Sequence, residues 1–139
     1  MVHLGGDAAG QFCWVDLAAT DAGRAKAFYG QLLGWTAAEE PANGGFFTRL
    51  QLAGRDVGSL YQLQEKQIAD GVPSHWTPYV RVDDVDDAVR RAVAIGRQVL
   101  VQAFDVADIA RIALILDPVG AHFGLWQPLS ANSEEDRHG

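Results

Sequence analysis

Hydrophobic and polar residues first alternate and then change to a helical spacing near the start of the chain. The stretch CWVDLAATD has the alternation typical of a strand, and the apolar positions after it recur at i, i+3, i+4 and i+7. These positions are Ala25, Phe28, Tyr29 and Leu32. Thr20 or Asp21 can cap the start of the helix, and Gly34 suits its left-handed end. The pattern therefore predicts a strand followed by an amphipathic helix.

The same plan recurs in the second half of the chain, in the stretch YVRVDDVDDAVRRAVAIG. Asp83 or Asp84 can cap this second helix, and Gly96 can end it. Its apolar stripe consists of Val85, Ala88, Val89, Ala92 and Val93. The chain therefore contains an internal repeat.

Three strand candidates follow each helix, with glycine and proline in the turns between them. They span residues 36–39, 46–52 and 56–63 in the first half, and 98–104, 109–116 and 121–127 in the second. The pattern predicts an α+β fold in which one domain, residues 1–139, contains two tandem βαβββ modules. We expect the first module at residues 11–63, a linker at 64–76, the second module at 77–128 and a flexible tail at 129–139.

A four-stranded sheet with a single helix has one covered face and one open face. Two such modules can place their open faces together and enclose a cleft between curved sheets. Ligand pockets form preferentially at junctions of this kind. The repeat therefore predicts a binding cleft between the modules.

Charge and composition argue against several classes of function. A net charge of −7 repels nucleic acid, and no basic stripe offsets it. The sequence contains no apolar run of 18 residues, so no membrane span is predicted. The start of the chain has no recognisable secretory signal. The single Cys13 fits a reducing compartment and lies in an apolar stretch, where a buried, inert thiol is expected. We expect a cytoplasmic protein that binds neither nucleic acid nor membranes.

Motifs in both halves resemble the vicinal oxygen chelate superfamily, which includes glyoxalase I, bleomycin-resistance proteins and extradiol dioxygenases. They are Asp21 with AFYGQLLGW in the first half, and VRVDDVDDAV with DPVGAHFGLW in the second. The resemblance covers about residues 11–128 and is closest to small actinobacterial glyoxalase-like proteins. It implies the glyoxalase/bleomycin resistance-like fold, in which the sheets of two βαβββ modules form a cleft. It also implies a homodimer.

Metal-dependent members of this superfamily place a His, Glu or Gln ligand on each of four cleft-lining strands. The resemblance puts these positions at Trp14, Thr77 and Gly124, with the fourth within residues 59–61. None of them supplies a good ligand for a divalent ion. We therefore expect no metal cofactor at the usual site.

A displaced metal site is the alternative. His75, His122 and Asp16 each lie two positions from an expected ligand position, so strand alternation keeps them on the same faces. Together they would form a set of two histidines and one carboxylate. In the other interpretation, His75 caps the linker, His122 covers a strand end and Asp16 bonds to a neighbouring backbone group or arginine. We favour the second interpretation.

Aromatic and small residues occupy the strand faces that a metal site would use. We expect a cleft lined by Trp14, Asp16, Tyr61, Tyr79, Arg81, His122 and Trp126. If the alternation is shifted by one residue, Cys13, Val15 and Leu17 face the cleft instead. Tryptophan and tyrosine rings suit stacking on a planar or cationic molecule. Trp35 and Trp76 are expected to serve in packing or at an interface.

Three functional hypotheses remain open. The favoured one is a metal-independent protein that sequesters or senses a small planar or cationic molecule, with Asp16, Arg81 and His122 orienting the ligand. The second is an enzyme, either a metal-dependent lyase or dioxygenase using His75, His122 and Asp16, or a metal-free enzyme with His122 as general base. The third is an interaction module whose aromatic residues only fill a core. Metal content separates the first two, and a screen of hydrophobic ligands separates the first from the third.

Overall fold

The structure of the protein is a computed structural model that describes residues 8–42 and 45–129. Its elements are β1 (Phe12–Ala19), α1 (Ala22–Leu33), β2 (Thr36–Ala42), β3 (Gly45–Leu52), β4 (Arg55–Gln62), α2 (Glu65–Ala69), β5 (His75–Arg81), α3 (Val85–Ala94), β6 (Gln98–Val106), β7 (Ala110–Leu116) and β8 (His122–Pro128). Three strands follow both α1 and α3, so the predicted α+β fold with two βαβββ modules is confirmed. None of the helices in the described part of the chain has the length and apolar character needed to cross a membrane.

The chain divides into two compact units. The N-terminal unit is Val15–Thr77, and the C-terminal unit is Pro78–Gly139 together with Met1–Trp14. The boundary falls within β1 and within β5, so each of these strands contributes to both units.

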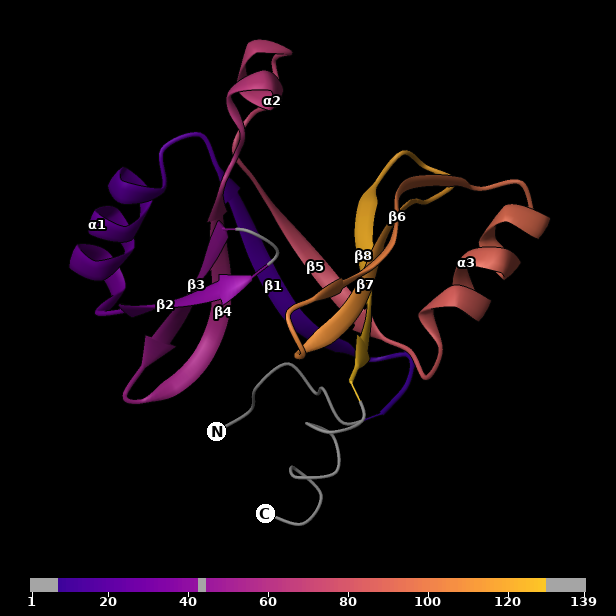
Figure 1. Ribbon diagram of the computed structural model, residues 1–139, viewed down its shortest axis with the longest axis horizontal. Coiled ribbons are helices and arrows are strands. Elements are labelled where there is room, and N and C mark those ends of the chain that lie inside the picture. Colours follow the sequence, from indigo (N-terminus) through magenta and orange to yellow (C-terminus); the bar gives the residue numbers. More distant parts are fainter. Residues whose placement is uncertain (1–7, 43–44, 130–139) are drawn as a thin grey trace. The chain divides into compact units, whose positions relative to one another are not determined.

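The N-terminal unit has the strand order β2-β3-β4-β1. β2, β3 and β4 are antiparallel neighbours, and β1 pairs with β4 in parallel. Helix α1 covers one face of this sheet (Figure 1). The core beneath the helix is formed by Leu17, Ala19, Leu50 and Leu60, with Ala22, Ala25, Tyr29, Trp35 and Val57 packed against them.

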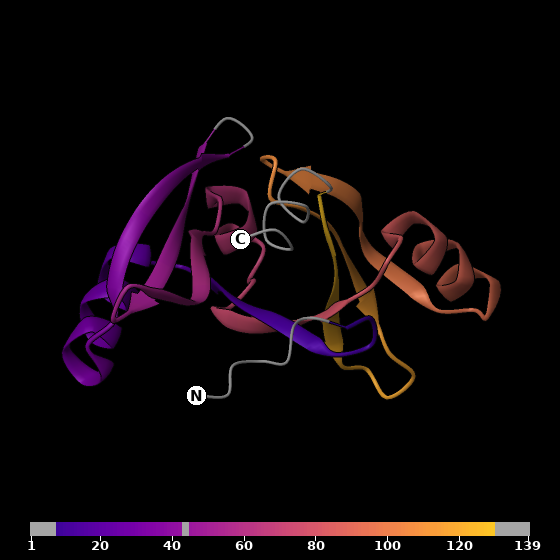
Figure 2. The ribbon, with the colours of Figure 1, turned by 90° about the horizontal axis from the view of Figure 1, so that it is seen from below.

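The C-terminal unit repeats this arrangement with the strand order β5-β8-β7-β6. β5 pairs with β8 in parallel, and the other neighbours are antiparallel. Helix α3 covers one face of this sheet, as Figure 2 shows from below. The core under α3 contains Val85, Val89, Ala113, Ile115 and Leu125. In both units the helix therefore covers one face of the sheet and leaves the opposite face uncovered by that helix.

The helix ends follow the predicted capping pattern. Of the two candidates at each start, Asp21 and Asp84 act as caps, and each accepts a hydrogen bond from a backbone N–H three residues later at 3.0 Å. Gly34 and Gly96 follow the helices with φ of 78° and 82°, the left-handed region that glycine adopts without strain. Sequence and local structure agree at all four ends.

The segment expected as a linker, residues 64–76, differs from the prediction. It contains the short helix α2, and its last two residues belong to β5, which begins at His75. The backbone N–H of Gln64 donates to Oε1 of Gln67 at 2.8 Å, a contact that supports the first turn of α2. Of the expected tail, residues 130–139 lie outside the described residues.

Trp35 and Trp76 pack around Tyr29 in the N-terminal unit, as expected for packing residues. The rings of Tyr29 and Trp35 stack with centroids 5.2 Å apart, and the ring of Trp76 meets that of Tyr29 edge-on at 5.7 Å. Nε1 of Trp76 also donates to the Tyr29 hydroxyl at 3.2 Å. Both tryptophans therefore belong to the helix-covered side of this unit.

Close approach of β1 and β4 gives a test of the fold. A β-carbon added at Gly58 would lie 2.9 Å from the carbonyl oxygen of Val15, so Gly58→Ala should lower the free energy of unfolding by about 1–3 kcal/mol. The matched control is Gly23→Ala in α1, where the nearest atom, Oδ1 of Asp21, is 3.6 Å away and alanine favours the helix by about 0.5–1 kcal/mol. Urea unfolding measures the free energy of unfolding of both variants and of the unmodified protein. Equal stabilities would contradict the β1–β4 packing.

Candidate functional site

The parallel strand pairs of the two units place equivalent residues side by side. In the N-terminal unit the register of β1 and β4 pairs Asp16 with Ser59. In the C-terminal unit the register of β5 and β8 pairs Tyr79 with Gly124. Tyr79 follows Asp16 by 63 residues and Gly124 follows Ser59 by 65, so the two pairs occupy corresponding positions of the repeat. The same position thus carries two polar residues in one unit, and a tyrosine beside a glycine in the other.

In the C-terminal unit the ring of Tyr79 lies directly on Gly124. A β-carbon added at Gly124 would overlap the Tyr79 ring, and the Tyr79 side chain is only 4% exposed. The Trp126 ring meets the Tyr79 ring edge-on with centroids 5.7 Å apart. It also lies 5.4 Å from the Trp14 ring at an interplanar angle of 31°. Glycine is needed here because only a residue without a side chain leaves room for the ring.

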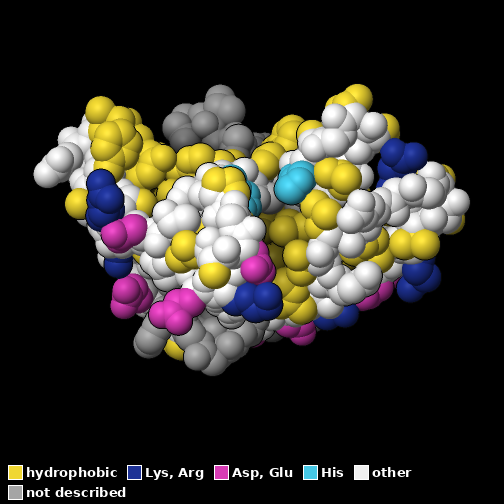
Figure 3. All heavy atoms as spheres, turned by 90° about the horizontal axis from the view of Figure 1, so that it is seen from above, with side chains coloured by type: hydrophobic (Ala, Val, Ile, Leu, Met, Phe, Trp, Pro, Cys, Tyr) yellow, Lys and Arg dark blue, Asp and Glu magenta, His cyan; other side chains and the backbone are white. Residues whose placement is uncertain are grey.

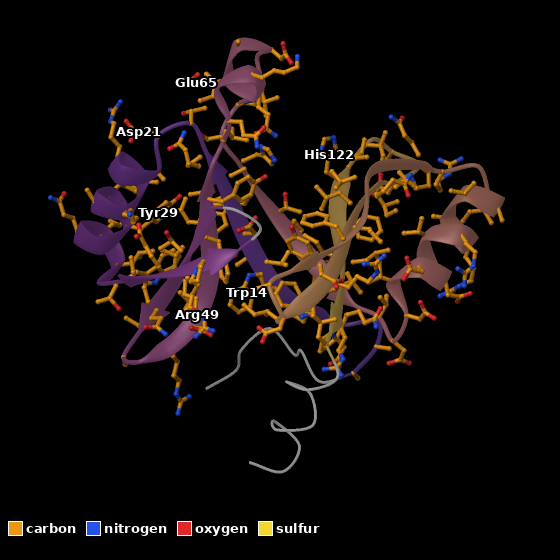
Figure 4. All side chains as sticks on the ribbon, in the orientation of Figure 1. Trp14, Asp21, Tyr29, Arg49, Glu65 and His122 are labelled. Carbon is orange, nitrogen blue, oxygen red and sulfur yellow. The ribbon has the colours of Figure 1, made fainter. Side chains whose placement is uncertain are left out.

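These three rings, Trp14, Tyr79 and Trp126, are called the aromatic face below. They pack with apolar residues of β7 on the side of the sheet opposite α3. Tyr79 is buried, whereas both tryptophans are half-buried and keep part of their indole surface accessible. Trp14 is labelled in Figure 4. The face is therefore partly core and partly accessible surface.

Arg81 and Cys13 lie close to the aromatic face. Arg81 is the register partner of Trp126, so its side chain leaves the sheet on the same side. Burial raises the pKa of the Cys13 thiol to about 11, and the positive charge of Arg81 acts in the opposite direction. Cys13 is therefore a thiol at neutral pH, in agreement with the expected inert cysteine.

His122 is exposed at the start of β8 (Figure 4). Trp126 lies four positions further along the same strand, which corresponds to about 13 Å. Histidine side chains are visible at the surface in Figure 3. The structure therefore places His122 on the predicted strand face, but away from the three rings.

In the N-terminal unit the Asp16 carboxylate is held by Ser59. The Ser59 hydroxyl donates to Oδ1 of Asp16 with 2.6 Å between the oxygens. Burial raises the pKa of Asp16 from 3.8 to about 6, while the Ser59 hydrogen bond and the charge of His75 act to lower it. Tyr61 is half-buried, and its pKa is raised by burial and then by the negative charge of Asp16. Asp16, Ser59 and Tyr61 thus form one electrostatically coupled group.

His75 is fixed by a local backbone contact. Its Nδ1 lies 2.8 Å from the carbonyl oxygen of Pro73, and because a carbonyl only accepts, Nδ1 donates this bond. This contact supports the favoured interpretation that His75 caps the linker.

The residues at the expected metal positions do not fit the superfamily's metal. Gly124 offers no side chain, and the Tyr79 ring fills the space above it. The Trp14 indole packs against Trp126, and Thr77 is buried with a single hydroxyl. Within residues 8–42 and 45–129 no three or more His, Cys, Asp or Glu side chains are grouped to hold a metal ion. In the alternative, displaced metal site, Asp16 and His75 belong to the N-terminal unit and His122 belongs to the C-terminal unit.

The structure brings the predicted residues together in two groups. One is the aromatic face with Arg81 beside it, and the other is Asp16 with Tyr61. In the N-terminal unit Leu17 packs in the core under α1. Because neighbouring side chains of a strand point to opposite faces, Asp16 lies on the other face, and the alternation there is not shifted by one residue. The sequence analysis missed Ser59 as a partner of Asp16, because only the register of β1 and β4 brings the two together. The expected cleft that would join both groups stays a prediction.

Comparison with known proteins identifies the family. A family model described as a glyoxalase-like domain matches residues 14–126. The chain belongs to this family. Membership in the wider glyoxalase/bleomycin resistance/dioxygenase superfamily agrees with the motifs in both halves of the sequence.

Curated relatives of this glyoxalase-like protein are about twice its length. A putative glyoxylase, CFP32, from Mycobacterium bovis is 40% identical over 116 residues, which is 82% of this chain and 44% of the relative. The anthracycline biosynthesis protein DnrV of Streptomyces peucetius is 31% identical over 132 residues, 86% of this chain and 48% of the relative. The chain thus spans a little under half the length of these relatives. The expected homodimer stays a prediction.

Solved structures share the fold of this glyoxalase-like domain. Methylmalonyl-CoA epimerase from Mycobacterium tuberculosis matches with a TM-score of 0.63 and 21% identity, covering 96% of this chain and 97% of the epimerase. A glyoxalase/bleomycin resistance protein/dioxygenase superfamily member from Vibrio splendidus 12B01 matches with a TM-score of 0.52 and 19% identity, covering 82% and 96%. At these identities the likeness shows the fold alone.

The raised pKa of Asp16 predicts a pH-dependent stability. The folded protein holds the Asp16 proton more tightly than the unfolded chain, so this proton stabilises the fold fully below about pH 4. The contribution is lost as the pH rises to about 6, and because each pKa unit corresponds to about 1.4 kcal/mol, the loss is at most about 3 kcal/mol.

Asp16→Asn removes this titration. The difference in unfolding free energy between Asp16→Asn and the unmodified protein should grow in favour of the variant from pH 4 to pH 6 and then level off. Asp70→Asn, which changes an exposed carboxylate of the same unit, is the matched control for the change of a carboxylate to an amide. A difference that stays constant from pH 4 to pH 7 for Asp16→Asn would contradict the raised pKa.

Proposed function

We propose that the protein binds a small planar or cationic molecule at the aromatic face, without the metal that other members of the superfamily use. The observation that carries this proposal is the packing of Tyr79 on Gly124. It places an aromatic ring where the superfamily would place a metal ligand, and it leaves the half-buried indoles of Trp14 and Trp126 as the accessible part of the face. Such a molecule would be sequestered or sensed rather than converted.

The chemistry of the face suits a flat ligand. Indole rings supply a large stacking area with little loss of conformational freedom, and each carries one hydrogen-bond donor. Arg81 lies beside Trp126 and is suited to orient a carbonyl or acidic group of the ligand. The net charge of −7 favours the approach of cationic ligands. His122, at the far end of β8, would contact only a long ligand.

The names of two relatives bear on the kind of ligand and on the alternative hypothesis that the protein is an enzyme. DnrV is an anthracycline biosynthesis protein, and anthracyclines are fused-ring planar compounds, which fits a stacking surface. CFP32 is a putative glyoxylase, which favours an enzyme, either a metal-dependent lyase or dioxygenase or a metal-free enzyme with His122 as general base. The metal-dependent alternative needs ligands that the expected positions do not supply. We therefore place binding first.

Fluorescence titration with planar compounds tests the proposal. The planar cation 9-aminoacridine should quench tryptophan emission saturably, and Trp126→Leu should weaken its binding at least tenfold, or about 1.4 kcal/mol, because stacking area is lost. The matched control is Trp76→Leu, which removes a tryptophan from the helix-covered side of the other unit and should leave the affinity unchanged. Circular dichroism verifies that both variants are folded. Equal affinity of the two variants, or no saturable quenching, would show that the aromatic face is not the binding surface.

A further inference from the structure

One oxygen of the Asp16 carboxylate is held by the protein and the other is open. Ser59 donates to Oδ1 at 2.6 Å, whereas Oδ2 has no partner among the described residues. Within the described part of the chain, no buried side-chain nitrogen or oxygen lacks a hydrogen-bond partner, so Oδ2 keeps accessible surface. Asp16 is therefore oriented by the strand pair while one acceptor oxygen remains available.

The cationic and titratable groups on the same face do not neutralise this carboxylate. Arg49 of β3 is the register partner of Ser59, but its Nη1 lies 3.9 Å from Oδ2 of Asp56. His75 of β5 donates its Nδ1 hydrogen to a backbone carbonyl and acts on Asp16 only through its charge. Among the ion pairs within 4.0 Å in residues 8–42 and 45–129, none includes Asp16. Within the described part of the chain, the Asp16 carboxylate thus forms no ion pair within 4.0 Å.

The surroundings of Asp16 would strengthen binding of a positive group. A partly buried carboxylate loses hydration, and an opposite charge that reaches it restores favourable electrostatics in a medium of low dielectric. The ring of Tyr61 lies on the same face of β4, two residues beyond Ser59, and adds an aromatic surface that also attracts cations. This face therefore combines the negatively charged carboxylate of Asp16 with the adjacent aromatic ring of Tyr61.

We propose that Oδ2 of Asp16, oriented by Ser59 and flanked by Tyr61, binds a protonated amine of a small ligand. This inference rests on the proposed small-molecule binding function and adds to it a binding point for an amine. The binding point lies within the N-terminal unit and is treated separately from the aromatic face of the C-terminal unit. The two assignments involve different residues, so they can fail separately.

Benzylammonium and benzyl alcohol form a matched pair of probes. Benzylammonium stays protonated from pH 5 to pH 8, and the alcohol has a similar shape without charge. In a calorimetric or NMR titration at pH 7.5, benzylammonium should bind at least tenfold more tightly than the alcohol. Asp16→Asn should abolish this preference, and Ser59→Ala should reduce it. Asp70→Asn, the exposed control in the same unit, should not change it.

A second readout follows Asp16 itself. The carboxyl carbon resonance of Asp16 gives its pKa directly, and saturating benzylammonium should lower that pKa by about one unit while benzyl alcohol leaves it unchanged. Binding of benzylammonium should weaken as the pH falls below 6, since protonation removes the charge. An affinity that rises at lower pH, or a preference that survives in Asp16→Asn, would overturn the proposal.

Trp126→Leu separates this inference from the proposed aromatic site. If 9-aminoacridine binding is lost in Trp126→Leu but the preference for benzylammonium remains, both assignments are supported. If the preference for benzylammonium is also lost in Trp126→Leu, the amine binds at the aromatic face and the Asp16 assignment is wrong. If Trp126→Leu changes neither, the aromatic assignment fails while the Asp16 site stands.

Discussion

The parallel pairing of the first and last strand of each module is the constraint on which the rest of the molecule depends. It fixes the pairs Asp16–Ser59 and Tyr79–Gly124 at corresponding positions of the repeat. Because side chains at paired positions leave a sheet on the same side, each pair is presented on the face that the helix does not cover. The backbone plan is shared by both units, and the chemistry of each face is decided by the two residues placed there.

These two pairs have opposite character. At the first pair, the Ser59 hydroxyl orients the Asp16 carboxylate, and burial raises the pKa of Asp16. One oxygen of this carboxylate accepts the bond from Ser59, and the other has no partner among the described residues. At the other, the absence of a side chain at Gly124 lets the Tyr79 ring lie on the strand and hold Trp126 beside it. Neither pair supplies matching ligands of the kind that a metal ion needs. Each unit therefore offers its own kind of interaction, a carboxylate in one and stacked rings in the other.

Much of the fold could be predicted from the sequence because its signals are local. Apolar spacing and the capping residues Asp21 and Asp84 located both helices, and glycine-containing turns located the strands. Helix α2 was missed because five residues are too few for periodicity, and its first turn depends on a glutamine contact that composition does not reveal. Ser59 was missed as the partner of Asp16, and the raised pKa of Asp16 was not foreseen. Both depend on strand register and burial, which arise only when residues 43 positions apart come together.

Metal content tests the central claim most directly. Protein purified without a histidine tag would be examined by mass spectrometry for bound metal and then titrated with zinc, nickel, manganese and iron. With aromatic and small residues at the positions where the superfamily places its ligands, we predict far less than one equivalent of metal and no saturable binding of any of the four ions. Near-stoichiometric metal that is lost in His75→Ala or His122→Ala would contradict this account. It would instead make a metal-dependent enzyme the correct interpretation.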